Sequence, residues 1–152
     1  MWLNKILLVL SMGLIIVGCA SDGHYAGRSA YNRPATNTDM GVRYLLGRGV
    51  PQDNAKAFQY FSKGASEDDP FAQNELAYMY ASGKGTSRDY AKALSFYQQA
   101  ANHGLASAQY NLGLMYLTGL GTAPNKALAL EWFRKSASHG FEPARIALGQ
   151  YQ

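Results

Sequence analysis

Apolar side chains recur along most of the chain at the spacing of one face of an α-helix. Ahead of Gly83, four of them fall at i, i+4, i+5 and i+8: Ala72, Leu76, Ala77 and Tyr80. This is the pattern of an amphipathic helix with 3.6 residues per turn. Gly83 is placed to adopt the left-handed conformation that ends such a helix. Pro70 suits its first turn, so the pattern predicts a helix between these two residues.

A second helical pattern follows after a short polar turn. Asp89 is placed to accept backbone N–H bonds as the N-cap, and Gly104 is placed to end the helix. The side chains expected to point inward are Ala91, Leu94, Tyr97 and Ala101. The segment therefore predicts two helices joined by a glycine turn.

This helix pair occurs three times with a period of 36 residues and without insertions. The residues that share a phase are Tyr44, Tyr80 and Tyr116; Gly47, Gly83 and Gly119; Gly49, Gly85 and Gly121; and the N-caps Asp53, Asp89 and Asn125. One helix pair cannot bury both of its faces, so the units must stack. A last first-helix pattern around Ala144 and Leu148 is expected to cap the third unit. The predicted fold is all-α, a short α-solenoid of about three 36-residue helix-turn-helix repeats plus a C-terminal capping helix.

The repeat also explains a sequence that resembles part of a phosphate-binding loop, Gly83-Lys84-Gly85. Such a loop needs a glycine five residues before the glycine that precedes lysine, and Ser or Thr after the lysine. Tyr78 and Gly85 occupy those two positions. Arg48 and Leu120 replace Lys84 in the other units, so these glycines are interpreted as a structural turn.

The N-terminus has the pattern of a secretory signal. A short head with one lysine precedes an apolar run of a dozen residues, which is shorter than the roughly 20 residues of a membrane-spanning helix. The run ends at Ile16-Val17-Gly18-Cys19, which resembles the lipobox of bacterial lipoproteins. This resemblance implies cleavage after residue 18 and lipidation of Cys19, the only cysteine. Ala20 in place of aspartate then favours the outer membrane, with the protein facing the periplasm.

Residues 19–38 show no helical or strand period and are rich in Gly, Ser, Ala and Asn. Such a segment buries too little apolar surface to offset its chain entropy, so we expect a flexible tether with a reach of roughly 20 to 25 Å. The expected organisation is a signal peptide over 1–18, the lipidated cysteine and tether over 19–38, and the repeat domain over 39–152.

The repeat resembles the Sel-1-like repeat family, which is related to tetratricopeptide repeats. The residues that carry the match in the third unit are Ala108, Leu112, Gly113, Tyr116, Gly119, Gly121, Trp132, Phe133, Ala137 and Gly140. The resemblance covers about Met40 to the C-terminus, although Leu128 replaces the usual lysine and Asp68 replaces a closing glycine. It implies a scaffold for protein interactions, often in bacterial envelopes and usually without catalysis.

The titratable residues do not form a catalytic or metal-binding pattern. There is no H-E-x-x-H sequence and no cysteine pair. His103 and His139 hold equivalent positions at helix ends, where an imidazole is favourable, and the run from Glu67 to Asp69 is interpreted as a solvated loop in which Asp69 caps a helix. We expect no catalytic residue, metal or cofactor. The basic residues are spread along the sequence, which argues against a nucleic-acid site and indicates a solvated surface.

A partner is expected on the first helices of the units, which line the concave surface of related solenoids. Positions at i, i+4 and i+7 form a stripe there, and the predicted partner-binding residues are Asn74, Tyr78, Tyr110, Leu114 and Leu117. The alternative, that these side chains pack between neighbouring helices, stays open.

The sequence therefore favours a lipid-anchored scaffold or adaptor that binds another periplasmic or envelope protein, with the chain itself expected to be monomeric. A module that binds peptidoglycan or another glycan is the alternative, suggested by Tyr110 beside Asn74 and Asn111. A hydrolase acting on the cell wall is less favoured, because the titratable groups do not converge.

Overall fold

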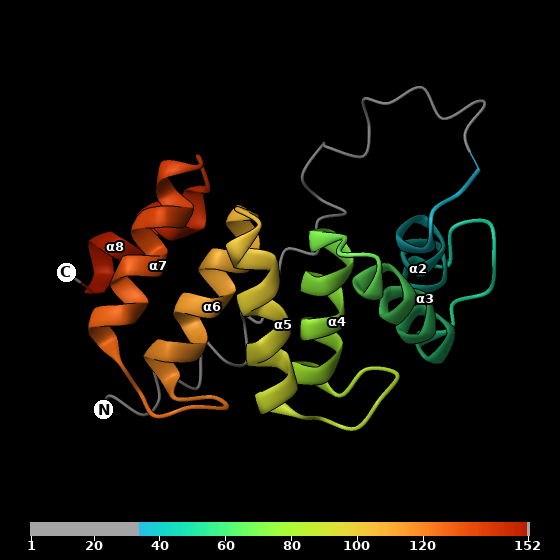
Figure 1. Cartoon of the computed structure of the whole chain (residues 1–152), viewed down its shortest axis with the longest axis horizontal. Helices are drawn as coiled ribbons and strands as arrows, with labels where there is room; N and C mark the ends of the chain where they lie inside the picture. The colour runs from blue at the N-terminus through green and yellow to red at the C-terminus, as the bar shows by residue number, and fades with distance from the viewer. Residues whose placement is uncertain (1–33, 152) are drawn as a thin grey trace.

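The computed structural model describes residues 34–151, which form a row of α-helices and, within this range, no β-strand (Figure 1). The helices are α2 (Asn37–Leu46), α3 (Asn54–Ser66), α4 (Pro70–Ser82), α5 (Tyr90–Asn102), α6 (Ala106–Thr118), α7 (Lys126–Ser138) and α8 (Glu142–Tyr151). The predicted signal peptide, Cys19 and most of the predicted tether lie outside the described residues. No helix in the described range is long and apolar enough to cross a membrane.

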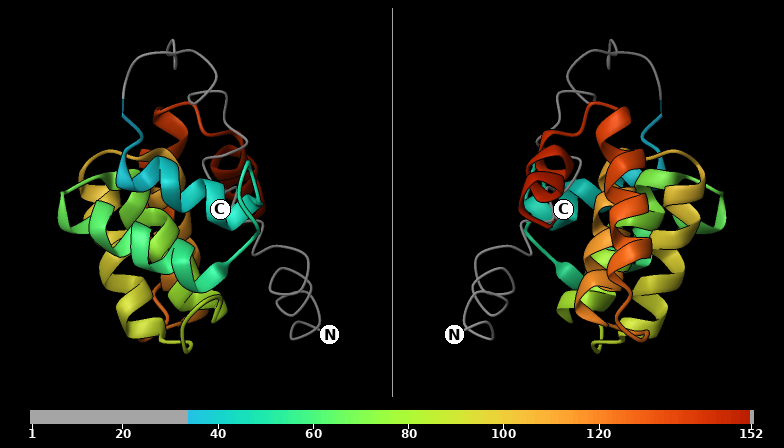
Figure 2. Two further views of the ribbon diagram at one scale, coloured as in Figure 1. Left: turned by 90° about the vertical axis from the view of Figure 1, so that its right-hand side faces the viewer. Right: turned by 90° about the vertical axis from the view of Figure 1, so that its left-hand side faces the viewer.

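Each helix packs against the next one along the chain, and α2 also contacts α4. The three units α2–α3, α4–α5 and α6–α7 thus stack in sequence, and α8 packs on the third. Figure 2 shows the stack from its two ends, with α2 and α3 towards the viewer in one view and α7 and α8 in the other. This confirms the predicted short α-solenoid of three repeats with a C-terminal helix.

The predicted helix caps are present in all three units. The side chains of Asp53, Asp89 and Asn125 each accept a bond from the backbone N–H three residues later, at 3.0 Å. The helix α2 begins at Asn37, two residues before the expected domain start, because Thr36 and Asp39 form a reciprocal capping box.

The core combines repeated alanines with a large aromatic residue at one equivalent position of each second helix. Phe61, Tyr97 and Phe133 are at most 1 % exposed. One of the predicted inward positions is wrong, because Ala91 is exposed while Ala93 is fully buried. Ala91 lies near the start of α5, next to the turn of the following unit, rather than on the face that meets α4 and α6.

The second glycine of the turn packs on the preceding unit in the second and third units. A Cβ at Gly85 would lie 2.2 Å from the backbone oxygen of Asn54, and a Cβ at Gly121 would lie 2.4 Å from that of Tyr90. Both glycines have positive φ, so two independent reasons exclude a side chain. The Gly-Lys-Gly sequence is therefore an inter-repeat contact.

Candidate partner-binding face

The predicted stripe lies on α4 and α6, and most of its side chains are half-buried. Tyr78, Tyr110, Leu114 and Leu117 each keep part of their surface exposed. We call the exposed parts of these four side chains the partner-binding face. Because all four sit on packed helices, their positions are fixed by the solenoid rather than by a loop.

Tyr110 is the most firmly anchored member of the face. Its ring centroid lies 5.5 Å from that of Phe133 on α7 and 5.5 Å from that of Phe141 before α8. Burial, with a smaller contribution from Tyr151, raises the pKa of the Tyr110 hydroxyl above its ordinary value. One side of Tyr110 therefore packs in the core, and the other side is exposed on the partner-binding face.

Leu114 and Leu117 also serve both roles. They pack against a small core cluster made of Ala129, Phe133 and Ala147. Tyr78 packs in the same way against a cluster that includes Met79 and Leu76. The sequence left open whether these side chains bind a partner or pack between helices. Each of them has one buried and one exposed side, so both interpretations apply to the same residues.

Asn74 has a different environment from the one expected. It is fully buried, its Oδ1 accepts a bond from Asn111 Nδ2 at 3.2 Å, and its own Nδ2 donates to Glu75 Oε1 at 3.2 Å. The bond from Asn111 joins α6 to α4, and the burial removes Asn74 from the residues that a partner can touch. Asn111 is only 5 % exposed, and the polar groups proposed to hold a sugar beside Tyr110 are therefore used inside the protein.

Lys84 belongs to this surface, although the stripe did not include it. Its Nζ lies 2.7 Å from the Tyr78 hydroxyl and 5.0 Å from the centroid of the Tyr78 ring. The two residues are six apart, a spacing that does not place them on one helical face. The turn after α4 reverses the chain and brings Lys84 back over Tyr78, and no helical periodicity reports such a contact.

Three of the titratable residues singled out in the sequence have structural partners. Asp69 accepts bonds from the Phe71 N–H at 2.9 Å, as the predicted cap of α4, and from Thr38 Oγ1 at 2.5 Å. Glu67 accepts a bond from Asn37 Nδ2 at 2.7 Å. His139 Nδ1 lies 3.0 Å from Gln109 Oε1, whereas His103 is exposed at the end of α5.

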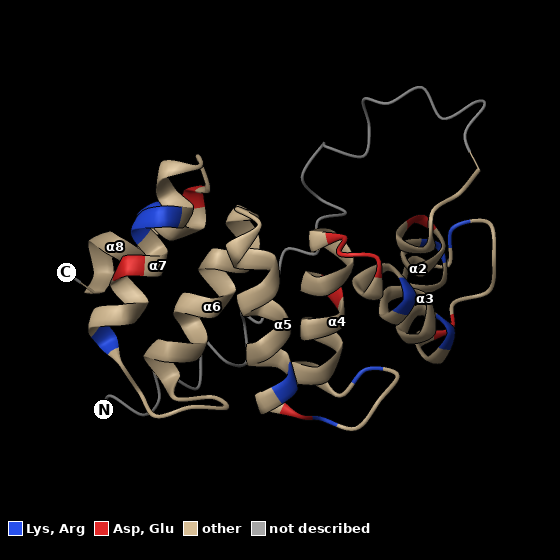
Figure 3. Ribbon diagram, viewed as in Figure 1, with Lys and Arg blue, Asp and Glu red and all other residues tan. Residues whose placement is uncertain are grey.

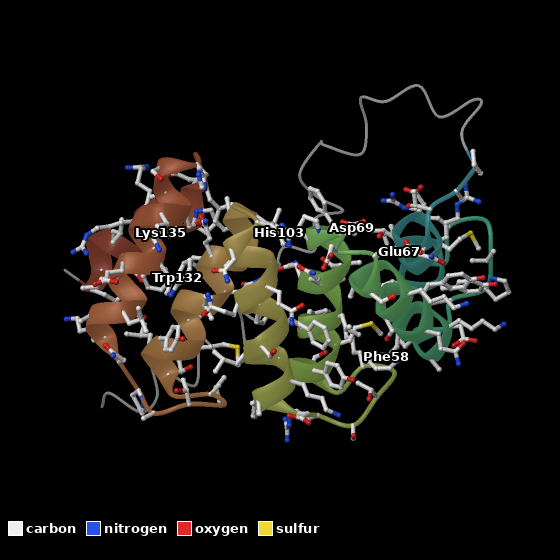
Figure 4. All side chains as sticks on the ribbon, viewed as in Figure 1. Phe58, Glu67, Asp69, His103, Trp132 and Lys135 are labelled. Carbon is white, nitrogen blue, oxygen red and sulfur yellow. The ribbon has the colours of Figure 1, made fainter. Side chains whose placement is uncertain are left out.

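Glu67, Asp69 and His103 all lie along the same edge of the stack (Figure 4). Among residues 34–151 no three His, Cys, Asp or Glu side chains gather where they could hold a metal ion.

The sequence matches the family profile described as Sel1 repeat in three consecutive blocks, at residues 34–69, 70–105 and 106–141. No curated protein matches the chain. Each block contains one complete helix pair of the structure.

Among the solved structures similar to this one are three with 19 to 36% sequence identity. A protective antigen of uropathogenic Escherichia coli with an SLR fold is 36% identical with a TM-score of 0.67, over 68% of this chain and 22% of its own length. A Sel1 repeat protein from Oxalobacter formigenes is 32% identical with a TM-score of 0.69, over 91% and 97% of the two chains. Cysteine rich protein B of Helicobacter pylori is 19% identical with a TM-score of 0.66, over 95% of both chains, and shows the fold alone. The chain spans about a fifth of the length of the Escherichia coli protein.

Proposed function

Because the chain belongs to the Sel1 repeat family, we propose that it is a non-catalytic adaptor that holds a protein partner on the partner-binding face. Sel1 repeats commonly bind protein partners, and their fold is generally a non-catalytic scaffold. The observation that carries the proposal is the row of half-exposed Tyr and Leu side chains on two adjacent helices.

These side chains suit a contact with a protein. Aromatic residues with a fixed orientation contribute strongly to interfaces, because they cover a large area and lose little conformational freedom on binding. Tyr110 is already held by Phe133 and Phe141, and Tyr78 is held by Lys84. A partner segment would therefore meet a preformed apolar surface.

The location of this adaptor in the cell envelope is part of the same proposal. Lipidation at Cys19 would anchor the chain in the outer membrane, and the segment before Thr36 would carry the solenoid into the periplasm. Each acyl methylene contributes about 0.8 kcal/mol to membrane affinity, so several acyl chains anchor a protein almost irreversibly. The support for this part is the sequence from Ile16 to Ala20.

Site-specific photo-crosslinking in intact cells tests the face. A photoreactive phenylalanine analogue replaces Leu117 in one variant and the exposed Glu131 of α7 in a control variant. We expect one discrete protein to be captured at position 117 and not at position 131. The same species at both positions, or no protein at either, would contradict the proposal.

A second variant separates binding from folding. Leu117→Ala introduces the residue that the second unit has at this position, Ala81, so the repeat architecture accepts it, although the contacts of Leu117 with the core cluster are lost. With the photoreactive analogue placed at Tyr78, capture should weaken in the Leu117→Ala background while circular dichroism still shows a folded helical protein at the temperature of the assay.

Lipidation is tested separately, by metabolic labelling with an alkyne fatty acid and separation of the inner and outer membranes. The unsubstituted protein should carry label and sediment with the outer membrane, and Cys19→Ser should lose both properties. Label that persists in Cys19→Ser would place the modification elsewhere.

A further inference from the structure

Six cationic side chains of the first two units lie in or beside the turns that join first and second helices, and the approach of Gly85 to Asn54 places these two turns next to each other. They are Arg43, Arg48, Lys56, Lys84, Arg88 and Lys92, and all are exposed. The carboxylates at these turns are Asp53 and Asp89, which lie 3.7 Å from Lys56 and Lys92 respectively. Within residues 34–151 the other four cations have no ion pair. We call these six cations the basic edge.

The repeat explains why basic residues that are dispersed in sequence lie together. Arg48 and Lys84 share one phase of the 36-residue period, and Lys56 and Lys92 share another. Gly85 packs on the backbone of Asn54, so the turn of the second unit continues directly from the start of α3. Basic residues that are far apart in the sequence therefore lie in or beside neighbouring turns, where their side chains are exposed to solvent, as the sequence indicated.

The opposite edge of the same units carries four acidic side chains and one cation, Lys63, in the last turn of α3. Asp39, Glu67, Asp68 and Asp69 lie at the start of α2 and where α3 meets α4. Figure 3 shows blue segments in the turn between α4 and α5, and red segments at the other end of α4. Separated charges of this kind steer and orient a charged partner as it approaches.

Lys84 connects the basic edge to the partner-binding face. It belongs to the turn, yet its Nζ contacts the hydroxyl and the ring of Tyr78. A chain that crosses the exposed part of the Tyr78 ring towards the turn therefore passes from an apolar surface to exposed cations. The third unit ends this arrangement, because Leu120 and Pro124 replace Lys84 and Arg88 there.

We propose that the basic edge binds an acidic segment of the protein partner, next to the apolar segment that occupies the partner-binding face. This inference rests on the proposed function and adds the chemistry of the partner. A protein chain can turn from a helix face onto the neighbouring edge, whereas a flat anionic bilayer contacts the edge alone. The contact between Lys84 and Tyr78 therefore favours a protein segment as the occupant.

The test uses the purified full-length protein and a fluorescent polyglutamate peptide as the probe, with fluorescence anisotropy as the readout. Binding should weaken as salt is added, because exposed charges are screened. The variant Lys84→Gln with Arg88→Gln should bind polyglutamate about tenfold more weakly. A matched control, Arg134→Gln with Lys135→Gln on α7, makes the same charge change and should bind like the unsubstituted protein.

Three outcomes would overturn the inference. Polyglutamate could bind equally well to all three proteins, or both double variants could lose affinity equally, which would indicate non-specific attraction. Alternatively, Lys84→Gln with Arg88→Gln could lose binding to phosphatidylglycerol vesicles while polyglutamate binding is unchanged, which would assign the edge to lipid.

The proposed function is tested by a different measurement, the photo-crosslinking from position 117. Crosslinking from position 117 leaves the basic edge unaltered, so a failure to capture a protein there counts against the proposed function, whereas a failure of polyglutamate binding counts against this inference alone.

Discussion

Gly113 on α6 lies directly against the ring of Phe133 on α7. A Cβ at position 113 would lie 2.6 Å from Phe133 Cε1 and 2.7 Å from Cδ1. Gly41 has the same relationship to Phe61 in the first unit, at 2.7 Å. The absence of a side chain at this position lets each aromatic ring fill the space between the two helices of its unit.

Gly113→Ala should therefore lower the free energy of unfolding. Overpacking a filled core costs about 1 to 3 kcal/mol, while replacing glycine by alanine inside a helix returns up to about 1 kcal/mol. We expect a net loss of about 1 to 2 kcal/mol in urea-induced unfolding. Gly149→Ala is the matched control, since no atom lies within 4 Å of its Cβ position. An equal effect of the two changes would show that the Phe133 ring can move aside without a loss of stability.

Comparing Gly121→Ala with Gly49→Ala should distinguish the stability lost through the inter-repeat contact from the stability lost through the left-handed backbone conformation. Gly121 and Gly49 have nearly the same φ, +74° and +73°, but only Gly121 approaches the backbone of the preceding unit. Alanine at position 49 should cost about 1 kcal/mol, from the left-handed conformation alone. Alanine at position 121 should cost at least about 2 kcal/mol more, because Tyr90 and Ala91 must move away. Stability is measured by thermal unfolding. Similar losses for both variants would mean that displacing the backbone of Tyr90 and Ala91 costs little free energy.

Asp68→Gly should stabilise the first unit. Asp68 has a positive φ of 57°, whereas the equivalent positions of the next two units hold Gly104 and Gly140. Aspartate tolerates this conformation better than most residues, but glycine adopts it without steric cost. We expect a gain of up to about 1 kcal/mol in the free energy of unfolding. Asp68→Ala is the control: if it stabilises equally, relief of repulsion from Glu67 and Asp69 is the cause.

The predictions that succeeded depend on contacts within one unit. The period, the N-caps at Asp53, Asp89 and Asn125, and the left-handed Gly83 each follow from a few neighbouring residues. Local chemistry of this kind is the same in every copy, so three copies in phase reinforce each other.

The features that the sequence did not give depend on how adjacent units cover each other. Asn74, Tyr110 and Ile146 share one phase, yet Asn74 is fully buried, Tyr110 is half-buried and Ile146 is 52 % exposed. Asn74 meets Asn111 of α6, and Tyr110 meets Phe141 before α8. The pattern of one helix does not show which neighbouring helix covers its exposed side chains. The basic edge likewise depends on the stacking of two units, so no single unit predicts it.

Tyr97→Phe should raise the stability of the second unit. Tyr97 is 1 % exposed, and its hydroxyl has no hydrogen-bond partner among the described residues. Phe61 and Phe133 fill the same position in the other units, so the ring without the hydroxyl fits this architecture. A buried hydroxyl that has lost its water costs about 1 to 3 kcal/mol, and we expect a gain of about 1 kcal/mol in urea unfolding at neutral pH.

The same variant should change the response to alkali. Burial, reinforced by the nearby Glu75 and Tyr78, raises the pKa of Tyr97 well above its ordinary value of 10.0. The folded protein keeps this proton after the unfolded chain has released it, so Tyr97 contributes a loss of stability as the pH rises above about 10. Tyr97→Phe lacks this loss, and its advantage over the unsubstituted protein should widen between neutral pH and pH above 10. Tyr60→Phe, at a half-exposed ring, controls for the general effect of removing a phenol. If Tyr97→Phe is less stable at both pH values, the hydroxyl makes a bond that stabilises the fold.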